Sequence, residues 1–220
     1  MNEKLKKHIN LLIERYPVLA ECKNSIIAAY DILEECFLTD HKLLIAGNGG
    51  SCADAEHIVG ELMKGFKYPR KCSVEFANKL KNIDSSRGIE LAEKLQGGLP
   101  AIALGGHQSL NTAYVNDVKD GGLLTFAQQV YGYGKEGDVL LGISTSGNSK
   151  NIMNATVVAH ALGLKVIGLT GQKGGELATV ADAVIKAPSS ETYMIQELHL
   201  PVYHCWCLML EDKFFGGKNQ

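Results

Sequence analysis

Hydroxyl side chains gather in one short stretch of the chain, at Ser144, Thr145, Ser146 and Ser149. A helix N-cap needs only one hydroxyl, so this cluster indicates more than a capped helix. Hydroxyls and backbone amides at a helix start can together hold a phosphate, and the helix dipole favours the negative charge. The stretch lacks the lysine of a GxxxxGK[ST] loop, which argues against an NTPase. We therefore expect a phosphate-bearing ligand there.

A glycine-rich stretch, GNGGS at residues 47–51, could bind the same kind of ligand. Glycines allow the backbone to approach an anion closely, and the amides of the following helix start attract it. An ordinary strand-to-helix turn with Ser51 as its N-cap explains a lone glycine loop about equally well. The glycine loop alone therefore does not decide between a phosphate site and an ordinary turn.

Acid–base groups stand at helical spacing in two places. His57 and Glu61 are four residues apart and would share one helix face, as two ligands of a metal or as a base beside its partner. A solvated surface pair is the plainer alternative. The last helical region adds Gln196, Glu197, His199 and His204 among large apolar residues, and core histidines with satisfied hydrogen bonds are the usual explanation for such a residue.

The elements that must position these groups alternate along the chain. The first 40 residues show apolar positions at helical spacing on both sides of Pro17, which predicts two helices. Short β-type runs then alternate with helical patterns, which predicts an α/β fold whose parallel sheet has helices on both faces. In such sheets ligands bind beyond the carboxyl ends of the strands, where both loops would lie. The expected strands cover 42–47, 100–104, 138–144, 164–170 and 181–188.

We expect a single domain over residues 41–215, preceded by an N-terminal helical extension over 1–40. These N-terminal helices would pack on the domain or on a neighbouring subunit. A charged segment over 67–98 breaks the alternation and contains two short helical patterns. It is interpreted as an insertion at the edge of the sheet or over the site.

Composition narrows the partners. The net charge of −2 provides no basic field for nucleic acid, so a small molecule is the expected partner. The charged start of the chain does not fit a signal peptide, and no apolar run approaches membrane-spanning length, so we expect a cytoplasmic protein without a membrane partner. The six cysteines form no CxxC pair and are expected to be reduced and mostly buried.

The motifs GNGGSCADAEHIVGEL, PAIAL, GDVLLGISTSGNSKNIMNA and IQELHLPVYHCWCLMLE stand in the order found in one group of enzymes. The chain resembles the phosphoheptose isomerase branch of the SIS (sugar isomerase) domain family over most of residues 40–212. The resemblance implies conversion of sedoheptulose 7-phosphate to D-glycero-D-manno-heptose 7-phosphate through an enediol, by a homotetramer with sites at its subunit interfaces. It also implies Glu61 as the base and His204 as the acid.

By the same resemblance, one zinc ion per subunit would be bound by His57, Glu61, Gln196 and His204. Gln196 and His204 lie roughly 12 Å apart along a helix at about 1.5 Å per residue. Either a bend at Pro201 shortens that span or neighbouring subunits share the ligands. The residues that match the family's substrate and phosphate contacts are Asn48, Gly49, Gly50, Ser51, Asn116, Asp117, Ser144, Thr145, Ser146, Ser149 and Gln196.

Two other functions stay open. A non-catalytic SIS module would bind a sugar phosphate or assist a protein partner, but the relative of that kind lacks the glutamate and histidine that stand here as Glu61 and His204. An isomerase of a different sugar phosphate is the second alternative. Family members often have a polar run such as TTD where this chain has Gly105, Gly106 and His107.

Overall fold

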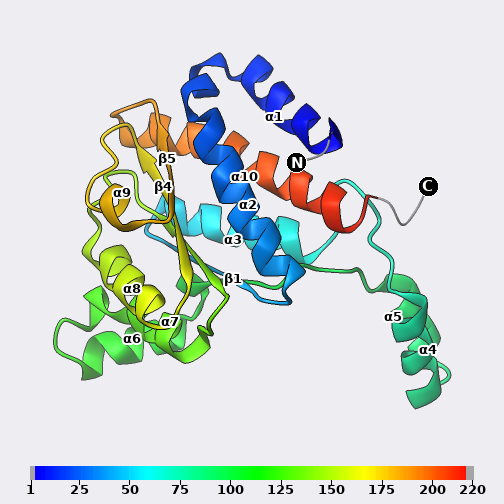
Figure 1. Cartoon of the computed structure of the whole chain (residues 1–220). Coiled ribbons are helices and arrows are strands. Elements are labelled where there is room, and N and C mark those ends of the chain that lie inside the picture. The colour runs from blue at the N-terminus through cyan, green and yellow to red at the C-terminus, as the bar shows by residue number, and fades with distance from the viewer. Residues whose placement is uncertain (1–2, 217–220) are drawn as a thin grey trace.

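A five-stranded parallel sheet forms the centre of the computed structural model, which describes residues 3–216 (Figure 1). The strand order is β2-β1-β3-β4-β5, and every neighbouring pair is parallel. All five expected strands are confirmed, each within a few residues of its predicted bounds. They are β1 (Leu43–Gly47), β2 (Ala101–Ala103), β3 (Val139–Ile143), β4 (Lys165–Gly171) and β5 (Ala183–Ala187).

The strands carry apolar side chains on both faces because helices cover both faces. All residues of β1 and β3 are buried, and Leu43 pairs with Val139 and Leu44 with Leu140. Successive side chains point to opposite faces, so Leu43 and Leu44 belong to two separate cores. Both faces of the sheet are therefore packed, as the alternating pattern predicts.

One face of the sheet is covered by four helices, and the last two of them carry the acid–base groups. They are α1 (Glu3–Arg15), α2 (Lys23–Leu38), α3 (Gly50–Met63) and α10 (Thr192–Phe214). The first two confirm the pair expected before the sheet, with a 3₁₀ turn at Pro17–Cys22 between them, and α1 packs on α10. None of the described helices is long and apolar enough to cross a membrane.

The opposite face is covered by α7 (Thr125–Tyr133), α8 (Lys150–Ala161) and the short α9 (Leu177–Val180). Next to α7 lies α6 (Gln108–Asp117), which buries none of its own residues. Two 3₁₀ turns, Leu104–Gly106 and Gly121–Leu123, connect these elements to the rest of the chain.

The segment interpreted as an insertion contains two helices, as expected, but they do not cover the site. The helices α4 (Val74–Ile83) and α5 (Arg87–Lys94) form a hairpin that stands off the body (Figure 1). The first buries no residue and the second only Gly88. An antiparallel bridge between Lys71 and Gln96 closes its base. We call residues 72–95 the arm; its status as an insertion relative to the family stays a prediction.

The topology makes the ends of β1 and β3 a candidate binding site. From β1 the chain passes through α3 and the arm to β2 on one side, while β3 lies on the other side of β1. Such a switch point leaves a crevice beyond the carboxyl ends of the two strands. The two loops singled out in the sequence follow these two strands.

Candidate active site

The glycine loop and the hydroxyl loop line one pocket together with the start of α10. Gly49 has a positive φ of 55°, which glycine adopts without strain. A Cβ on Gly50 would lie 2.7 Å from the Gln196 amide nitrogen, so a side chain there would push the Gln196 amide away from the loop. The pocket is lined by Asn48, Gly49, Gly50, Ser51, Ile143, Ser144, Thr145, Ser149, Thr192 and Gln196. We call it the loop pocket.

Hydrogen bonds fix the shape of the loop pocket. The hydroxyls of Ser144 and Ser149 are 2.9 Å apart. The side-chain amides of Asn48 and Asn151 exchange two hydrogen bonds of 3.0 and 2.8 Å, which tie the glycine loop to α8. Sequence reasoning missed Asn151, since an asparagine in the first turn of a helix carries no signal of its own.

Three residues predicted to contact substrate lie outside this pocket. The Ser146 hydroxyl accepts a 3.1 Å hydrogen bond from the backbone N–H of Asn148 and lines the adjacent pocket beside Lys173. Asn116 and Asp117 are exposed at the end of α6, where the Asn116 amide donates to the Asp117 carboxylate at 2.9 Å. Their contacts with substrate stay predictions.

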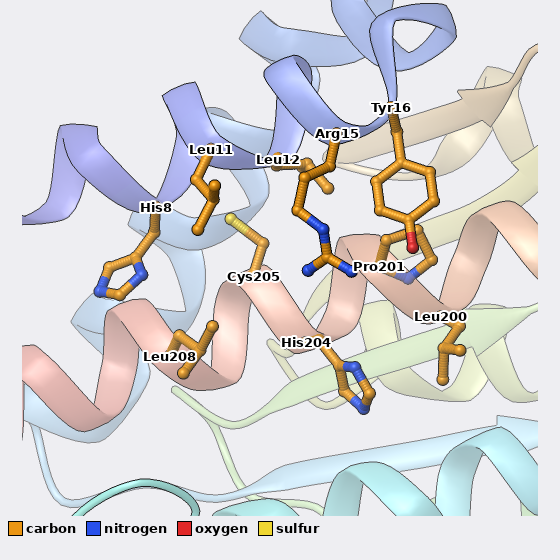
Figure 2. A pocket seen from close by; sticks show the side chains of 10 residues that line it. All are labelled: His8, Leu11, Leu12, Arg15, Tyr16, Leu200, Pro201, His204, Cys205 and Leu208. Carbon is orange, nitrogen blue, oxygen red and sulfur yellow. The ribbon is translucent and has the colours of Figure 1, made fainter.

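The acid–base groups from α3 and α10 meet at a second place. The Nε2 atom of His57 lies 3.3 Å from Glu61 Oε1 and 3.3 Å from His204 Nε2. Helix α10 carries His204, whose ring points away from α1 and toward α3 (Figure 2). Burial, and then the neighbouring His57, lower the pKa of His204 below its ordinary value. We call His57, Glu61 and His204 the acid–base cluster.

The Glu61 carboxylate is only 14% exposed and has a second contact, because its Oε2 lies 3.3 Å from Lys64 Nζ. Lys64 comes one turn later on the chain, at the end of α3, and its side chain is 57% exposed. One carboxylate oxygen thus faces a histidine and the other an exposed lysine. The predicted role of Glu61 as the base requires that its carboxylate can reach a proton on a bound ligand.

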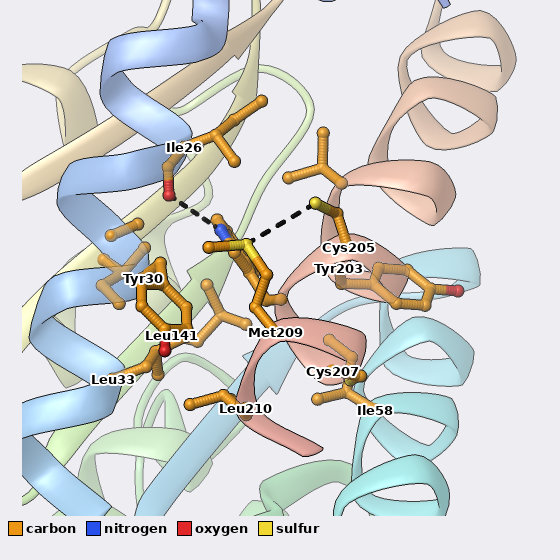
Figure 3. Close-up of a cluster of buried hydrophobic side chains, with 14 of the residues drawn as sticks. Ile26, Tyr30, Leu33, Ile58, Leu141, Tyr203, Cys205, Cys207, Met209 and Leu210 are labelled. Atoms are coloured by element: carbon orange, nitrogen blue, oxygen red, sulfur yellow. Dashed lines mark hydrogen bonds between the residues drawn. The ribbon is translucent and has the colours of Figure 1, made fainter. Parts of the chain in front are cut away.

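Two residues behind the cluster, the buried Tyr203 and the half-buried Asp54, were missed by sequence reasoning. The Tyr203 hydroxyl lies 3.1 Å from both Asp54 Oδ1 and His57 Nδ1. Figure 3 shows Tyr203 on α10 beside the core, with its hydroxyl pointing away from α2. Asp54 stands three residues before His57, and this shared helix face was the available signal. For Tyr203 no signal existed besides its place next to His204.

A metal ion fits part of this arrangement. With bonds of 2.0–2.1 Å, two ligand atoms of a tetrahedral zinc site are roughly 3.3 Å apart, and the two spacings around His57 Nε2 match this distance. Within residues 3–216, however, no group of three or more His, Cys, Asp and Glu side chains qualifies as a metal site. Gln196 lies against Gly50 in the loop pocket. Zinc binding by the predicted four ligands stays a prediction.

The two parts of the site are two helical turns apart on both helices that carry them. On α3, Gly50 precedes His57 by roughly 10 Å, and on α10, Gln196 precedes His204 by roughly 12 Å, at about 1.5 Å per residue. A ligand with an anionic end in the loop pocket would therefore place its other end near the acid–base cluster. An extended sugar phosphate has this form.

The fold and the two loops define a sugar-isomerase class of protein, and the SIS domain family model matches residues 87–171. Two curated relatives extend the likeness over nearly the whole chain. The phosphoheptose isomerase of Geotalea daltonii is 38% identical over 90% of this chain and 89% of its own length. That of Aneurinibacillus thermoaerophilus is 35% identical over 99% of this chain and 98% of its own length.

A solved structure agrees. The phosphoheptose isomerase of Francisella tularensis superposes with a TM-score of 0.73 and 31% identity, covering 96% of this chain and 100% of that one. At this identity and coverage, the chain belongs to the phosphoheptose isomerase family.

Proposed function

We propose that this chain interconverts sedoheptulose 7-phosphate and D-glycero-D-manno-heptose 7-phosphate, with its acid–base cluster as the catalytic centre. The family makes it a sugar-phosphate isomerase. The observation that supports the catalytic centre is the 3.3 Å approach of His57 to both Glu61 and His204, two turns away from a pocket suited to a phosphate. Its loop pocket would hold the phosphate through Ser144, Thr145 and Ser149 and the amides that start α3 and α8.

The reaction moves one proton between the first two carbons of the sugar. In the direction from ketose to aldose, Glu61 removes a proton from C1 while His204 gives one to the carbonyl oxygen on C2, which yields the enediol. Glu61 then returns its proton to C2, and the hydroxyl on C1 gives its proton back to His204 as the aldehyde forms. Both residues end in their starting state, so the cycle balances.

We also propose zinc at the acid–base cluster, with His57, Glu61 and His204 as ligands. When bound, zinc would polarise the sugar carbonyl and stabilise the oxyanion that develops on it. The role of Gln196 is then orientation of the ligand in the loop pocket, with metal ligation only if the sugar or a second subunit rearranges α10.

We further propose that the protein is a homotetramer and that it is located in the cytoplasm. Exposed apolar side chains on α1 and α10, including Leu11 and Leu200, line the groove beside His204 and would be covered by a second subunit (Figure 2). Sites shared between subunits would give the exposed Asn116 and Asp117 a ligand to contact. The six cysteines are all free, which suits a reducing compartment.

The experiment is to incubate the purified protein with sedoheptulose 7-phosphate and to follow aldose formation. A positioned acid or base contributes about 10²–10⁴-fold to rate, so Glu61→Gln and His204→Asn should each lose at least about 100-fold in kcat. Both replacements keep size and polarity, so binding of the phosphosugar should survive.

Matched controls make the same chemical changes on distant surfaces. Glu35→Gln on α2 and His160→Asn on α8 alter exposed residues and should leave kcat unchanged. If the Glu61 and His204 variants isomerise at the wild-type rate, these residues are not the catalytic pair. A wild-type protein that binds the sugar phosphate but isomerises none would instead support the non-catalytic adaptor function, and activity on another ketose phosphate would change the substrate.

A further inference from the structure

Tyr203 joins the two helices of the acid–base cluster from behind. Its side chain is 1% exposed on α10, and its hydroxyl lies 3.1 Å from Asp54 Oδ1 and 3.1 Å from His57 Nδ1, both on α3. The His57 ring meets the Tyr203 ring edge-on at 5.5 Å between centroids. Position and orientation of the hydroxyl are thus held by packing as well as by hydrogen bonds.

The hydroxyl has only one proton to give. An ionised carboxylate can only accept, so the Tyr203 proton goes to Asp54. The hydroxyl oxygen then remains as an acceptor for His57, and Nδ1 must be the atom that donates. Because a neutral imidazole carries one N–H, its Nε2 is left with a bare lone pair.

The position of the Asp54 carboxylate is energetically unfavourable, and packing alone does not explain it. Its second oxygen, Oδ2, is buried and has no hydrogen-bond partner in the described part of the chain. Burial raises the pKa of Asp54, while the Tyr203 hydroxyl and His57 oppose that rise. The contact with Tyr203 is therefore what the carboxylate contributes to the site.

We propose that Tyr203 and Asp54 are positioning residues that hold His57 in the Nδ1–H tautomer, so that Nε2 presents its lone pair to Glu61 and His204. In the opposite tautomer, the Nε2–H of His57 would point at Glu61 Oε1, 3.3 Å away. A hydrogen bond from it would engage the carboxylate that is proposed as the base. With Nε2 bare, Glu61 stays free to take a proton from the sugar, and His57 can bind a cation. This inference deepens the proposed function and rests on it for its catalytic consequence.

The experiment measures the tautomer and the kinetics separately. The ¹⁵N shifts of the histidine rings are recorded in chelator-treated, metal-free protein, with His57→Gln to assign the His57 signals. The wild type should show Nδ1–H. Tyr203→Phe keeps the ring and removes the acceptor, so a mixture is expected. In Asp54→Asn the amide can donate to the hydroxyl, which turns its proton toward Nδ1 and should invert the tautomer to Nε2–H.

In the kinetic measurement, Tyr203→Phe and Asp54→Asn should each lose about 10–100-fold in kcat, as is typical when a hydrogen-bond partner behind an active-site histidine is removed. Their KM should hardly change, because the loop pocket is untouched. Tyr30→Phe is the matched control: it removes another buried tyrosine hydroxyl, on α2 in the core of Figure 3, and should change neither readout.

Wild-type Nε2–H, or one tautomer in all three proteins, would overturn the proposal. So would a shifted tautomer with unchanged kcat, since the orientation would then serve no step. If the wild type isomerises no sugar phosphate, the proposed function fails, while the ¹⁵N shifts still decide whether Tyr203 and Asp54 set the tautomer.

Discussion

At the scale of single residues, α10 carries two histidines with opposite surroundings. His204 faces α3 and the acid–base cluster, whereas His199 is fully buried and its Nε2 lies 3.1 Å from the Thr170 carbonyl. The carbonyl accepts, so Nε2 is the donor, and the buried Nδ1 has no hydrogen-bond partner in the described residues. His199 therefore acts as a neutral core residue that ties α10 to β4, and His204 is the histidine that we propose as the acid.

His199 should make stability depend on pH. Burial lowers its pKa to about 4 from the ordinary 6.5, so between these values the unfolded chain binds a proton that the folded chain refuses. Stability then falls as pH falls, by about 2 kcal/mol between pH 7 and pH 5 from this residue. Urea unfolding of wild type and His199→Gln at both pH values checks this. The difference between the two proteins should change with pH; parallel behaviour would contradict the assignment.

At the scale of elements, a buried ion pair joins the two helices that carry the acid–base cluster. Arg70 and Glu211 are each 1% exposed, and Arg70 Nε donates to Glu211 Oε1 at 2.8 Å. The guanidinium also donates to the backbone carbonyls of Leu62 and Glu61 at 2.7 and 3.1 Å, which satisfies the end of α3. Glu211, on α10, accepts in addition from the N–H groups of Phe66 and Lys67.

Breaking this pair should be costly. Glu211→Gln leaves the Arg70 charge buried without its counter-charge, so the free energy of unfolding should fall by about 3–5 kcal/mol. The matched control is Glu75→Gln, which breaks the exposed pair with Lys79 and should cost less than about 1 kcal/mol. Urea unfolding at pH 7 and one protein concentration measures both. Equal losses in the two variants would mean that the buried pair does not hold α3 and α10 together.

Sequence patterns predicted the elements well because each strand and helix signals itself locally. The five β-type runs and the two N-terminal helices correspond to the observed ones, and both loops lie at the switch point. Contacts between elements could not be predicted in the same way from the sequence. That Tyr203 reaches Asp54, or that Arg70 caps α3, depends on how α10 lies against α3, which no periodicity encodes. Likewise, the Gln196 amide lies against Gly50, a contact between residues 146 positions apart in sequence.

At the scale of the whole molecule, the arm differs from the helices that cover the sheet in that its apolar side chains are mostly exposed. Its apolar side chains include Val74, Phe76 and Ile83, all exposed, whereas α1 buries Leu5, Ile9 and Leu12 on the body. The arm has two exposed ion pairs, Lys79–Glu75 and Lys94–Glu90. Each lies within a single helix and does not connect the arm to the body. We therefore expect that the fold of the body does not depend on the arm.

Removing the arm should leave the fold and the isomerase reaction intact. Lys71 and Gln96 pair at its base, so an Asn-Gly turn can replace residues 72–95 and close a hairpin. Because α4 buries nothing and α5 only Gly88, the free energy of unfolding should change by less than about 1 kcal/mol, and the shorter connection costs little entropy. Urea unfolding and the rate with sedoheptulose 7-phosphate are the measurements.

Deletion of α1 is the comparison, because it removes three buried apolar side chains, each worth about 1.5–3 kcal/mol. That variant should lose at least about 4 kcal/mol. If instead the armless protein unfolds as easily, the arm supports the body through contacts with another subunit. If it folds but no longer isomerises, the arm completes a site in the assembly, since within one chain it stands apart from both the loop pocket and the acid–base cluster.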